Sequence, residues 1–139
     1  MRLRIPNRDA RRLWLDAQGL GRPPTEPLDV PGIIRKLGFV QLDTIQIVSR
    51  AHHHILWSRD GRYREGMLDR LLRTRAVFEH FTHDASVLPM EFYPYWRRRF
   101  GQMAERVDGW EWHRGMVDAA GRAEIVARIA AGMTRSARS

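Results

Sequence analysis

Apolar residues recur at helical spacing in two early segments of the chain. In residues 8–18 they fall three or four positions apart, at Ala10, Leu13, Trp14 and Ala17. Residues 29–38 repeat the pattern, with Asp29 and Pro31 suited to the first turn of a helix and Gly38 suited to its end. The spacing therefore predicts two amphipathic helices.

The apolar pattern changes to a two-residue period after Gly38. Residues 39–45 are rich in strand-forming side chains, and the alternation places Gln41 and Asp43 on one face of the predicted strand. An amide and a carboxylate on one face could position a water molecule and stabilise a developing cation. The alternative is an ordinary exposed strand face, because Gln-x-Asp is a common triplet.

The remaining pattern predicts more helix and one β-hairpin. Helices are expected over residues 48–58 and around Met67 and Leu71, and a hairpin over residues 76–88 that ends at Pro89. Together with the earlier elements, this order outlines a winged helix. The predicted fold class is therefore mainly α with a small β component.

The same outline predicts the domain organisation. A winged helix-turn-helix domain is expected over residues 1–89, followed by a helical extension over residues 90–132. Residues 133–139 carry no core pattern and are expected to form an unstructured tail.

The composition excludes several classes of protein. The 139 residues, of which 43% are hydrophobic and 29% charged, suffice for one domain with an ordinary core. The absence of cysteine excludes a disulfide scaffold, thiolate zinc sites and cysteine catalysis. No stretch reads as a membrane span or a signal peptide, so a cytoplasmic protein without a membrane partner is expected.

The charge balance favours a polyanionic partner. Lys and Arg number 24 against 16 Asp and Glu, which gives a net charge of +8 that lies mainly in the first hundred residues. Phosphate backbones are the commonest partner for such a surface. An alternative is codon bias, because Lys36 is the only lysine among the basic residues.

Three consecutive histidines, His52 to His54, raise the question of a metal site. Neighbouring residues on a helix point about 100° apart, so three in a row cannot all face one ion. No further ligand spacing accompanies them, and we expect no metal. The expected role is a polar helix surface with one ring turned inward.

Two other clusters leave alternatives open. One cluster surrounds the proposed hairpin turn and consists of Glu79, His80, His83 and Asp84. These side chains could act as catalytic acids and bases, or they could form the solvated tip of the wing. Arg97, Arg98 and Arg99 follow aromatic residues, which suits contacts with phosphates and bases, or equally a helix with inward aromatics and solvated arginines. The sequence pattern does not decide between these alternatives.

Two longer strings resemble one known family. Residues 37–59 read LGFVQLDTIQIVSRAHHHILWSR, and residues 78–89 read FEHFTHDASVLP. Both strings are similar to segments of the YcaQ-like DNA glycosylases, bacterial proteins built of tandem winged helices that repair alkylated bases and interstrand crosslinks. The similarity spans most of residues 5–130.

The resemblance implies a site and a reaction. Gln41 and Asp43 match the Gln-x-Asp form of the family's catalytic pair, so they are the expected catalytic residues. The implied reaction hydrolyses the N-glycosidic bond of N7-alkylated purines and unhooks interstrand crosslinks, without a metal or cofactor. A lyase step needs an amine nucleophile, for which Lys36, the only lysine, and the α-amine are the two candidates. This scarcity of amines favours a monofunctional glycosylase.

The implied partner is double-stranded DNA that carries alkylated or crosslinked purines, bound by a monomer at the nucleoid. The candidates for phosphate contacts are Arg50, Arg59, Arg97, Arg98 and Arg99. An alternative is a non-catalytic winged-helix DNA-binding protein, which would tolerate replacement of Gln41 and Asp43. Because family members are longer, the chain is also expected to be a truncated form, inactive alone or a non-functional remnant.

Overall fold

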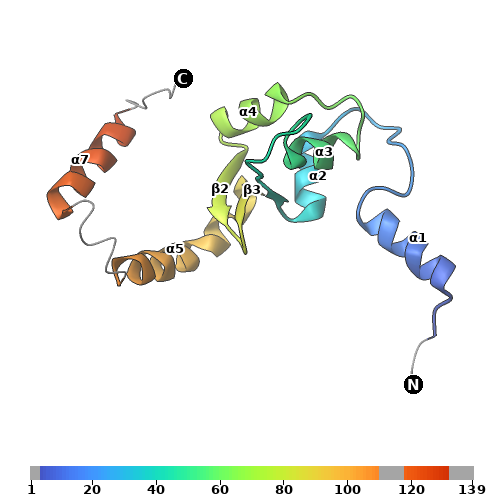
Figure 1. The fold of residues 1–139 in the computed structure, drawn as a ribbon, viewed down its shortest axis with the longest axis horizontal. Coiled ribbons are helices and arrows are strands. Elements are labelled where there is room, and N and C mark those ends of the chain that lie inside the picture. The colour runs from blue at the N-terminus through green and yellow to red at the C-terminus, as the bar shows by residue number, and fades with distance from the viewer. Residues whose placement is uncertain (1–3, 110–117, 132–139) are drawn as a thin grey trace. The chain divides into compact units, whose positions relative to one another are not determined.

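The computed structural model describes residues 4–109 and 118–131 (Figure 1). The chain divides into two compact units, Met1–Pro94 and Tyr95–Ser139. The predicted tail over residues 133–139 lies outside the described residues.

The N-terminal unit has the element order of a winged helix. Its helices are α1 (Asn7–Ala17), α2 (Val30–Leu37), α3 (Ala51–Trp57) and α4 (Gly66–Arg73). Its strands are β1 (Val40–Gln41), β2 (Val77–Phe81) and β3 (Ala85–Pro89). They form an antiparallel sheet in the order β1-β3-β2, with β2 and β3 joined as a hairpin. The predicted mainly α, winged-helix-like fold is confirmed.

Local sequence explains why α2 forms where it does. The Asp29 side chain accepts a hydrogen bond from the Gly32 backbone N–H at 2.9 Å and caps the first turn, in which Pro31 needs no hydrogen bond of its own. Gly38 ends the helix with a φ of 84°, a conformation that other residues disfavour. Between these ends, the apolar face buries Ile34 completely.

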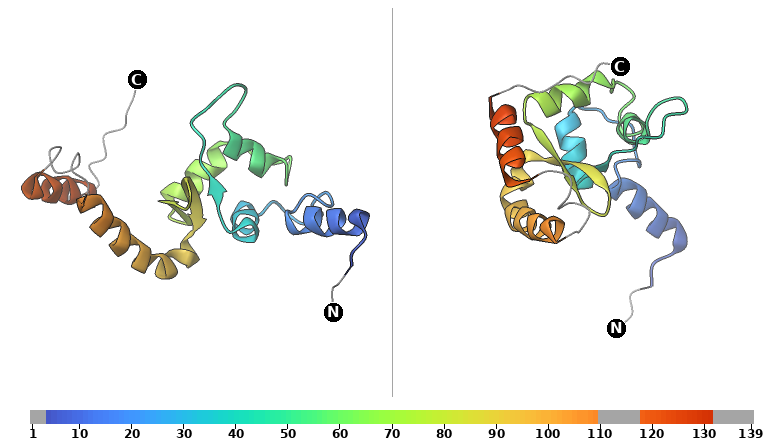
Figure 2. Two further views of the ribbon diagram at one scale, coloured as in Figure 1. Left: turned by 60° about the horizontal axis from the view of Figure 1, so that its bottom comes forward. Right: turned by 60° about the vertical axis from the view of Figure 1, so that its left-hand side comes forward.

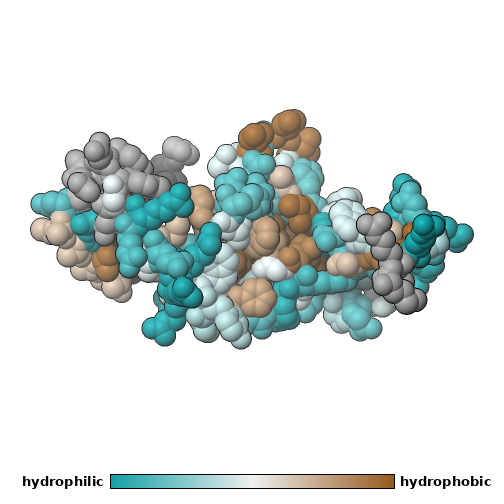
Figure 3. Space-filling model, turned by 90° about the horizontal axis from the view of Figure 1, so that it is seen from below, coloured by the Kyte–Doolittle hydropathy of each residue, from teal (hydrophilic) through white to brown (hydrophobic). Residues whose placement is uncertain are grey.

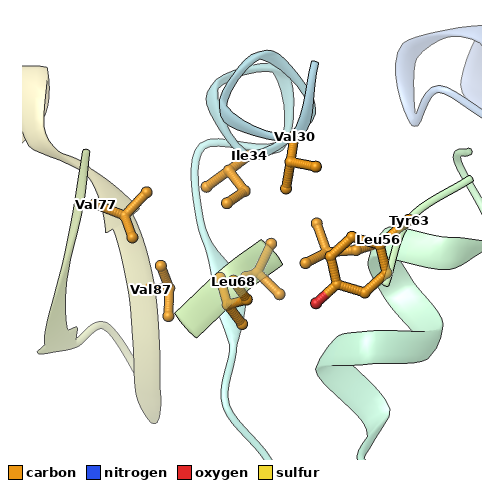
Figure 4. Packing of buried hydrophobic residues seen from close by; sticks show 8 residues of the cluster. Val30, Ile34, Leu56, Tyr63, Leu68, Val77 and Val87 are labelled. Atoms are coloured by element: carbon orange, nitrogen blue, oxygen red, sulfur yellow. The ribbon is translucent and has the colours of Figure 1, made fainter. Parts of the chain in front are cut away.

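Helices α2, α3 and α4 pack with the sheet around one small hydrophobic core (Figure 4). The buried side chains of this core are Val30, Ile34, Val40, Leu56, Tyr63, Leu68, Val77 and Val87. Burying one aliphatic side chain contributes roughly 1.5–3 kcal/mol. The core draws on every element from α2 to β3, so it fixes the end of β1 against the helices.

Strand β1 is much shorter than the sequence predicts. The expected strand covered residues 39–45, but only Val40 and Gln41 pair with β3, and the Leu42 N–H adds one bond to the Ala85 carbonyl at 2.7 Å. If the same register continued, Asp43 would lie opposite Asp84, in the turn of the β2–β3 hairpin and outside β3. The length of the partner strand therefore limits β1, and the rest of the predicted strand is loop.

The chain between β1 and α3 projects from the unit as a loop (Figure 2, left). Helix α3 begins at Ala51 rather than near the predicted position 48. Ile47 and Val48 are 91% and 84% exposed, so the apolar residues that predicted an earlier helix start do not belong to the core.

Helix α1 matches the predicted range but not the predicted burial. Its residues Leu13 and Trp14 are 60% and 61% exposed, and no residue of this helix is buried. Lys36 Nζ donates a hydrogen bond to the Asp16 carbonyl at 2.8 Å and ties the C-terminal end of α1 to α2. The amphipathic pattern therefore predicted the helix, while its apolar face stays open to solvent.

Among the described residues, the chain after the sheet is helical. A 3-10 turn at Met90–Phe92 leads into helix α5 (Tyr93–Asp108), and helix α7 (Ala119–Ala130) lies further along. Asp118 caps α7 by accepting a hydrogen bond from the Gly121 N–H at 2.8 Å. Within the described ranges, no helix has the length and apolarity needed to cross a bilayer.

We predict that Leu56→Ala lowers the free energy of unfolding by about 2–5 kcal/mol, because it empties a fully buried position of the core. The matched change Ile47→Ala removes a side chain that is mostly exposed and should cost less than about 0.5 kcal/mol. Urea unfolding followed by circular dichroism measures both values. Similar losses in the two variants would contradict the assigned core.

Candidate functional site at the end of strand β1

Gln41 is the last residue of β1 and lies beside the hairpin turn. In the sheet register it stands opposite Ser86, which is fully buried. The Gln41 side chain donates a hydrogen bond from Nε2 to Asp84 Oδ2 at 3.2 Å. Asp84 Oδ1 accepts in turn from the Ala85 N–H at 2.9 Å, so the hairpin turn positions the carboxylate that holds the Gln41 amide.

Asp43 begins the projecting loop. Its Oδ1 atom accepts a hydrogen bond from the Ile45 backbone N–H at 2.8 Å, an Asx turn that redirects the chain after the sheet. Its own backbone N–H donates to Nδ1 of His52 at 3.2 Å. Asp43 is half-buried, and these two contacts fix both its backbone and its carboxylate.

Gln41 and Asp43 each keep one acceptor atom open. In the part of the chain that the structure describes, no hydrogen bond engages Gln41 Oε1 or Asp43 Oδ2. The two side chains also make no hydrogen bond to each other there, because each is held by a different neighbour. An amide oxygen and a carboxylate oxygen are therefore available at the end of the sheet to accept from water or a substrate.

His52 is the buried support of Asp43. It lies in the first turn of α3 and is 4% exposed. Because Nδ1 accepts the Asp43 N–H, the neutral ring carries its proton on Nε2. Burial lowers the pKa of His52, and the neighbouring His53 and Arg50 lower it further. The sequence predicted one inward ring among the three histidines but gave no signal of its bond to Asp43.

A second set of polar contacts fixes the far end of the loop. Ser49 Oγ donates to Glu65 Oε1 at 2.5 Å, and this bond is the main cause of the lowered pKa of Glu65. The His53 ring stacks on Tyr63, with its Nδ1 atom 2.8 Å from the Tyr63 hydroxyl. These four residues and Trp57 are among those that line a hollow of about 390 Å³ beside the loop.

A larger hollow, of about 710 Å³, lies between the end of α1 and α2. Its lining includes Asp16, Lys36 and Arg59 but neither Gln41 nor Asp43. Lys36 Nζ and Arg59 Nε are both bonded to backbone carbonyls of the α1 region, so these cations already serve the fold. We therefore place the candidate site at the end of β1 and not in this hollow.

The arginines predicted to contact phosphates differ in their surroundings. Arg50 is exposed at the base of the loop, directly before α3. Arg59 is half-buried and donates to two backbone carbonyls, at 3.1 and 2.9 Å. Arg97, Arg98 and Arg99 are exposed on α5. Of these arginines, Arg50 is the one in the loop that begins at Asp43, where it is the last residue before α3.

One residue of the hairpin-turn cluster reaches the site. Asp84 binds the Gln41 amide, whereas His80 Nδ1 lies 3.0 Å from the Phe81 carbonyl. Among the described residues, no three His, Asp or Glu side chains converge to hold a metal ion. The turn thus acts on the site through Asp84, a role that the sequence pattern did not single out.

We predict that the protein loses stability between about pH 7.5 and about pH 5.5 because of His52. An unfolded histidine gains a proton as the pH falls through its ordinary pKa of 6.5, whereas the lowered pKa of buried His52 keeps the folded protein from doing so. The unfolded state then binds more protons, and the free energy of unfolding decreases. Urea unfolding at the two pH values measures the decrease.

Two glutamine variants separate His52 from its neighbours. His52→Gln removes this titration and should show a smaller decrease between the two pH values. His54→Gln changes an exposed position on the same helix and should keep the full decrease. If His52→Gln depends on pH as the wild type does, the role assigned to the buried ring is wrong.

Residues 34–139 match the profile of a protein family described as DNA glycosylase AlkZ-like. The match covers more than half of the chain and includes Gln41, Asp43, His52 and the whole projecting loop. No solved structure matches the chain. The family match agrees with the resemblance carried by residues 37–59, and it indicates a glycosylase that acts on DNA. The chain belongs to the AlkZ-like family of DNA glycosylases.

Proposed function

We propose that the protein hydrolyses the N-glycosidic bond of N7-alkylated purines in double-stranded DNA, with Asp43 and Gln41 as catalytic residues. One observation carries this proposal. Asp43 is fixed through its Oδ1 atom and its backbone N–H, and its Oδ2 atom remains open beside the end of β1. A fixed carboxylate with one open oxygen is suited to stabilise positive charge on a nearby sugar.

The reaction demands little more than such a carboxylate. An N7-alkylated purine is cationic, so the base leaves with the electron pair of the C1′–N9 bond as a neutral molecule. The sugar then carries the positive charge as an oxocarbenium ion, which Asp43 stabilises. Water adds to C1′ and gives up one proton, which Asp43 Oδ2 accepts and passes to solvent. No separate general acid is required.

Gln41 complements this carboxylate. Asp84 holds its Nε2 group, which turns the amide so that Oε1 remains available as an acceptor. Such an oxygen can bind the attacking water while Asp43 faces the sugar. The pair thus divides the work of orienting water and stabilising charge.

The placement of Lys36 favours hydrolysis over a lyase reaction. A Schiff-base intermediate needs an amine at C1′. Lys36 is the only lysine of the chain, and its Nζ atom is bonded to the Asp16 carbonyl in the hollow beside α1. Gln41 and Asp43 do not line that hollow.

The same chemistry extends to interstrand crosslinks between N7 atoms of purines. Each end of such a crosslink is an N7-alkylated purine, so cleaving one glycosidic bond unhooks the two strands. The net charge of +8 and the exposed Arg50 at the loop support binding to the phosphate backbone. We propose that the protein binds damaged DNA in this way as a monomer at the nucleoid.

A second candidate function is DNA binding without catalysis. The exposed arginines of α5, Arg97 to Arg99, favour it, since they could bind phosphates whether or not a base is released. Under this alternative, Gln41 and Asp43 would be replaceable.

We predict that Asp43→Asn and Gln41→Ala lower the single-turnover rate of base release by about 100-fold or more, because each removes an interaction made in the transition state. Binding of a duplex with one N7-methylguanine should change by less than about threefold, since phosphate contacts dominate affinity. Abasic sites, revealed by alkaline strand cleavage, measure release, and fluorescence anisotropy measures binding.

The matched control is Glu79→Gln, which removes an exposed carboxylate of β2 and should release the base at the wild-type rate. Release by Asp43→Asn at the rate of this control would refute the proposed catalytic role. A wild-type protein that binds the duplex but releases no base would instead support the non-catalytic alternative.

A further inference from the structure

The loop that follows Asp43 carries an exposed apolar tip, formed by Ile45, Ile47 and Val48. Their exposed fractions are 70%, 91% and 84%. In Figure 3, apolar residues gather where the N-terminal unit projects, at the top of the view. Scattered apolar residues are normal on protein surfaces, whereas several within one short projecting segment mark a site of interaction.

The apolar tip is exposed although contacts hold the loop at both ends. The Ile45 N–H is bonded to Asp43, and Gln46 and Arg50 form a backbone bridge across the base of the loop. Ser49 is bonded to Glu65. The loop is therefore built to present these side chains outward.

We infer that the apolar tip inserts into the base stack of duplex DNA at the nucleotide whose base is removed. This inference rests on the proposed function, because only base removal requires an opened stack. A base alkylated on one strand only, with no bond to the other strand, is reached by turning its nucleotide out of the helix, which leaves a gap in the stack. Isoleucine, leucine and phenylalanine side chains are the wedges that other proteins insert between base steps.

The position of the loop supports DNA as the occupant. The apolar tip begins two residues after Asp43, so the loop that carries it starts at the carboxylate proposed to face the sugar. No acidic residue lies between Asp43 and Arg50, and Arg50 is exposed at the base of the loop. The two carboxylates at the ends of the loop are already engaged, since Asp43 Oδ1 accepts from the Ile45 N–H and Glu65 Oε1 accepts from Ser49. The apolar tip itself carries no charge that would repel phosphates, and Arg50 is the cation next to it. A second copy of the chain or a lipid surface would give no reason for this position.

The test compares the full chain with two double variants. Ile47→Gln with Val48→Gln removes the centre of the apolar tip. Val126→Gln with Ile129→Gln removes an equally apolar pair on α7, where the side chains are 65% and 59% exposed. The probe is a duplex with 2-aminopurine next to an N7-methylguanine that a 2′-fluorine protects from hydrolysis. Fluorescence of 2-aminopurine rises when its neighbour leaves the stack.

We expect wild type and the α7 variant to raise this fluorescence at saturating protein, and the tip variant to raise it by less than about one fifth as much. On the unprotected duplex, the tip variant should release the base about tenfold more slowly or worse. Its anisotropy affinity for an undamaged duplex should change by less than about threefold, because phosphates are still bound. Both replaced side chains are exposed, so circular dichroism melting should show a folded protein.

The results separate this inference from the proposed function. The wild type could raise 2-aminopurine fluorescence but release no base, while the tip variant fails to raise the fluorescence. This result would support the wedge and contradict catalysis. Base release and unstacking at wild-type levels in the tip variant would overturn the wedge and leave catalysis standing. Unchanged unstacking together with lost dimer formation in sedimentation, or with lost binding to anionic phospholipid vesicles, would also overturn it and assign the apolar tip to that partner.

Discussion

The backbone N–H of Asp43 donates a hydrogen bond to the buried His52 ring, and this contact decides where the chain goes after β1. The sheet offers no further partner at that point, because β3 has already reached the hairpin turn. A buried imidazole takes over as acceptor, so the peptide is satisfied without a strand. The Asp43 carboxylate accepts a hydrogen bond from the Ile45 N–H through Oδ1, which leaves its Oδ2 atom open. The His52 contact thus joins the end of β1, the Asp43 carboxylate and the start of the loop at one residue.

The small core explains how so short a strand can carry a site. Val40 of β1 is buried beside Val87 of β3, and Leu56 of α3 packs in the same cluster, one helical turn after His52. The core thus holds β1 and α3 in place on either side of the loop. Burial of the core side chains stabilises the fold, while the loop between β1 and α3 exposes Ile45, Ile47 and Val48 to water. Such a division between a packed scaffold and a projecting loop is common where loops carry function.

Much of the fold could be predicted from local sequence, and the exceptions share one physical cause. Helix α2 follows directly from its cap at Asp29 and its stop at Gly38, both of which are local signals. The length of β1 depends on where its antiparallel partner β3 begins, at Ala85, far along the chain, so alternation of side chains could not reveal it. Ile47 and Val48 resemble the start of an amphipathic helix, but the loop exposes both, because tertiary position overrides helical propensity.

The candidate site divides in the same way. Gln41 and Asp43 could be identified from their types, spacing and resemblance to a family. Asp84 and His52, which hold them, could not, since both contacts are formed only when the hairpin and α3 fold against β1.

The position of Asp43 depends on its hydrogen bond to His52, and nitrogen NMR of the histidine rings tests this bond most directly. We predict a neutral His52 ring at pH 7 with its proton on Nε2 and a hydrogen-bonded, unprotonated Nδ1. A His52 ring that carries its proton on Nδ1, or on both nitrogens at this pH, would contradict it.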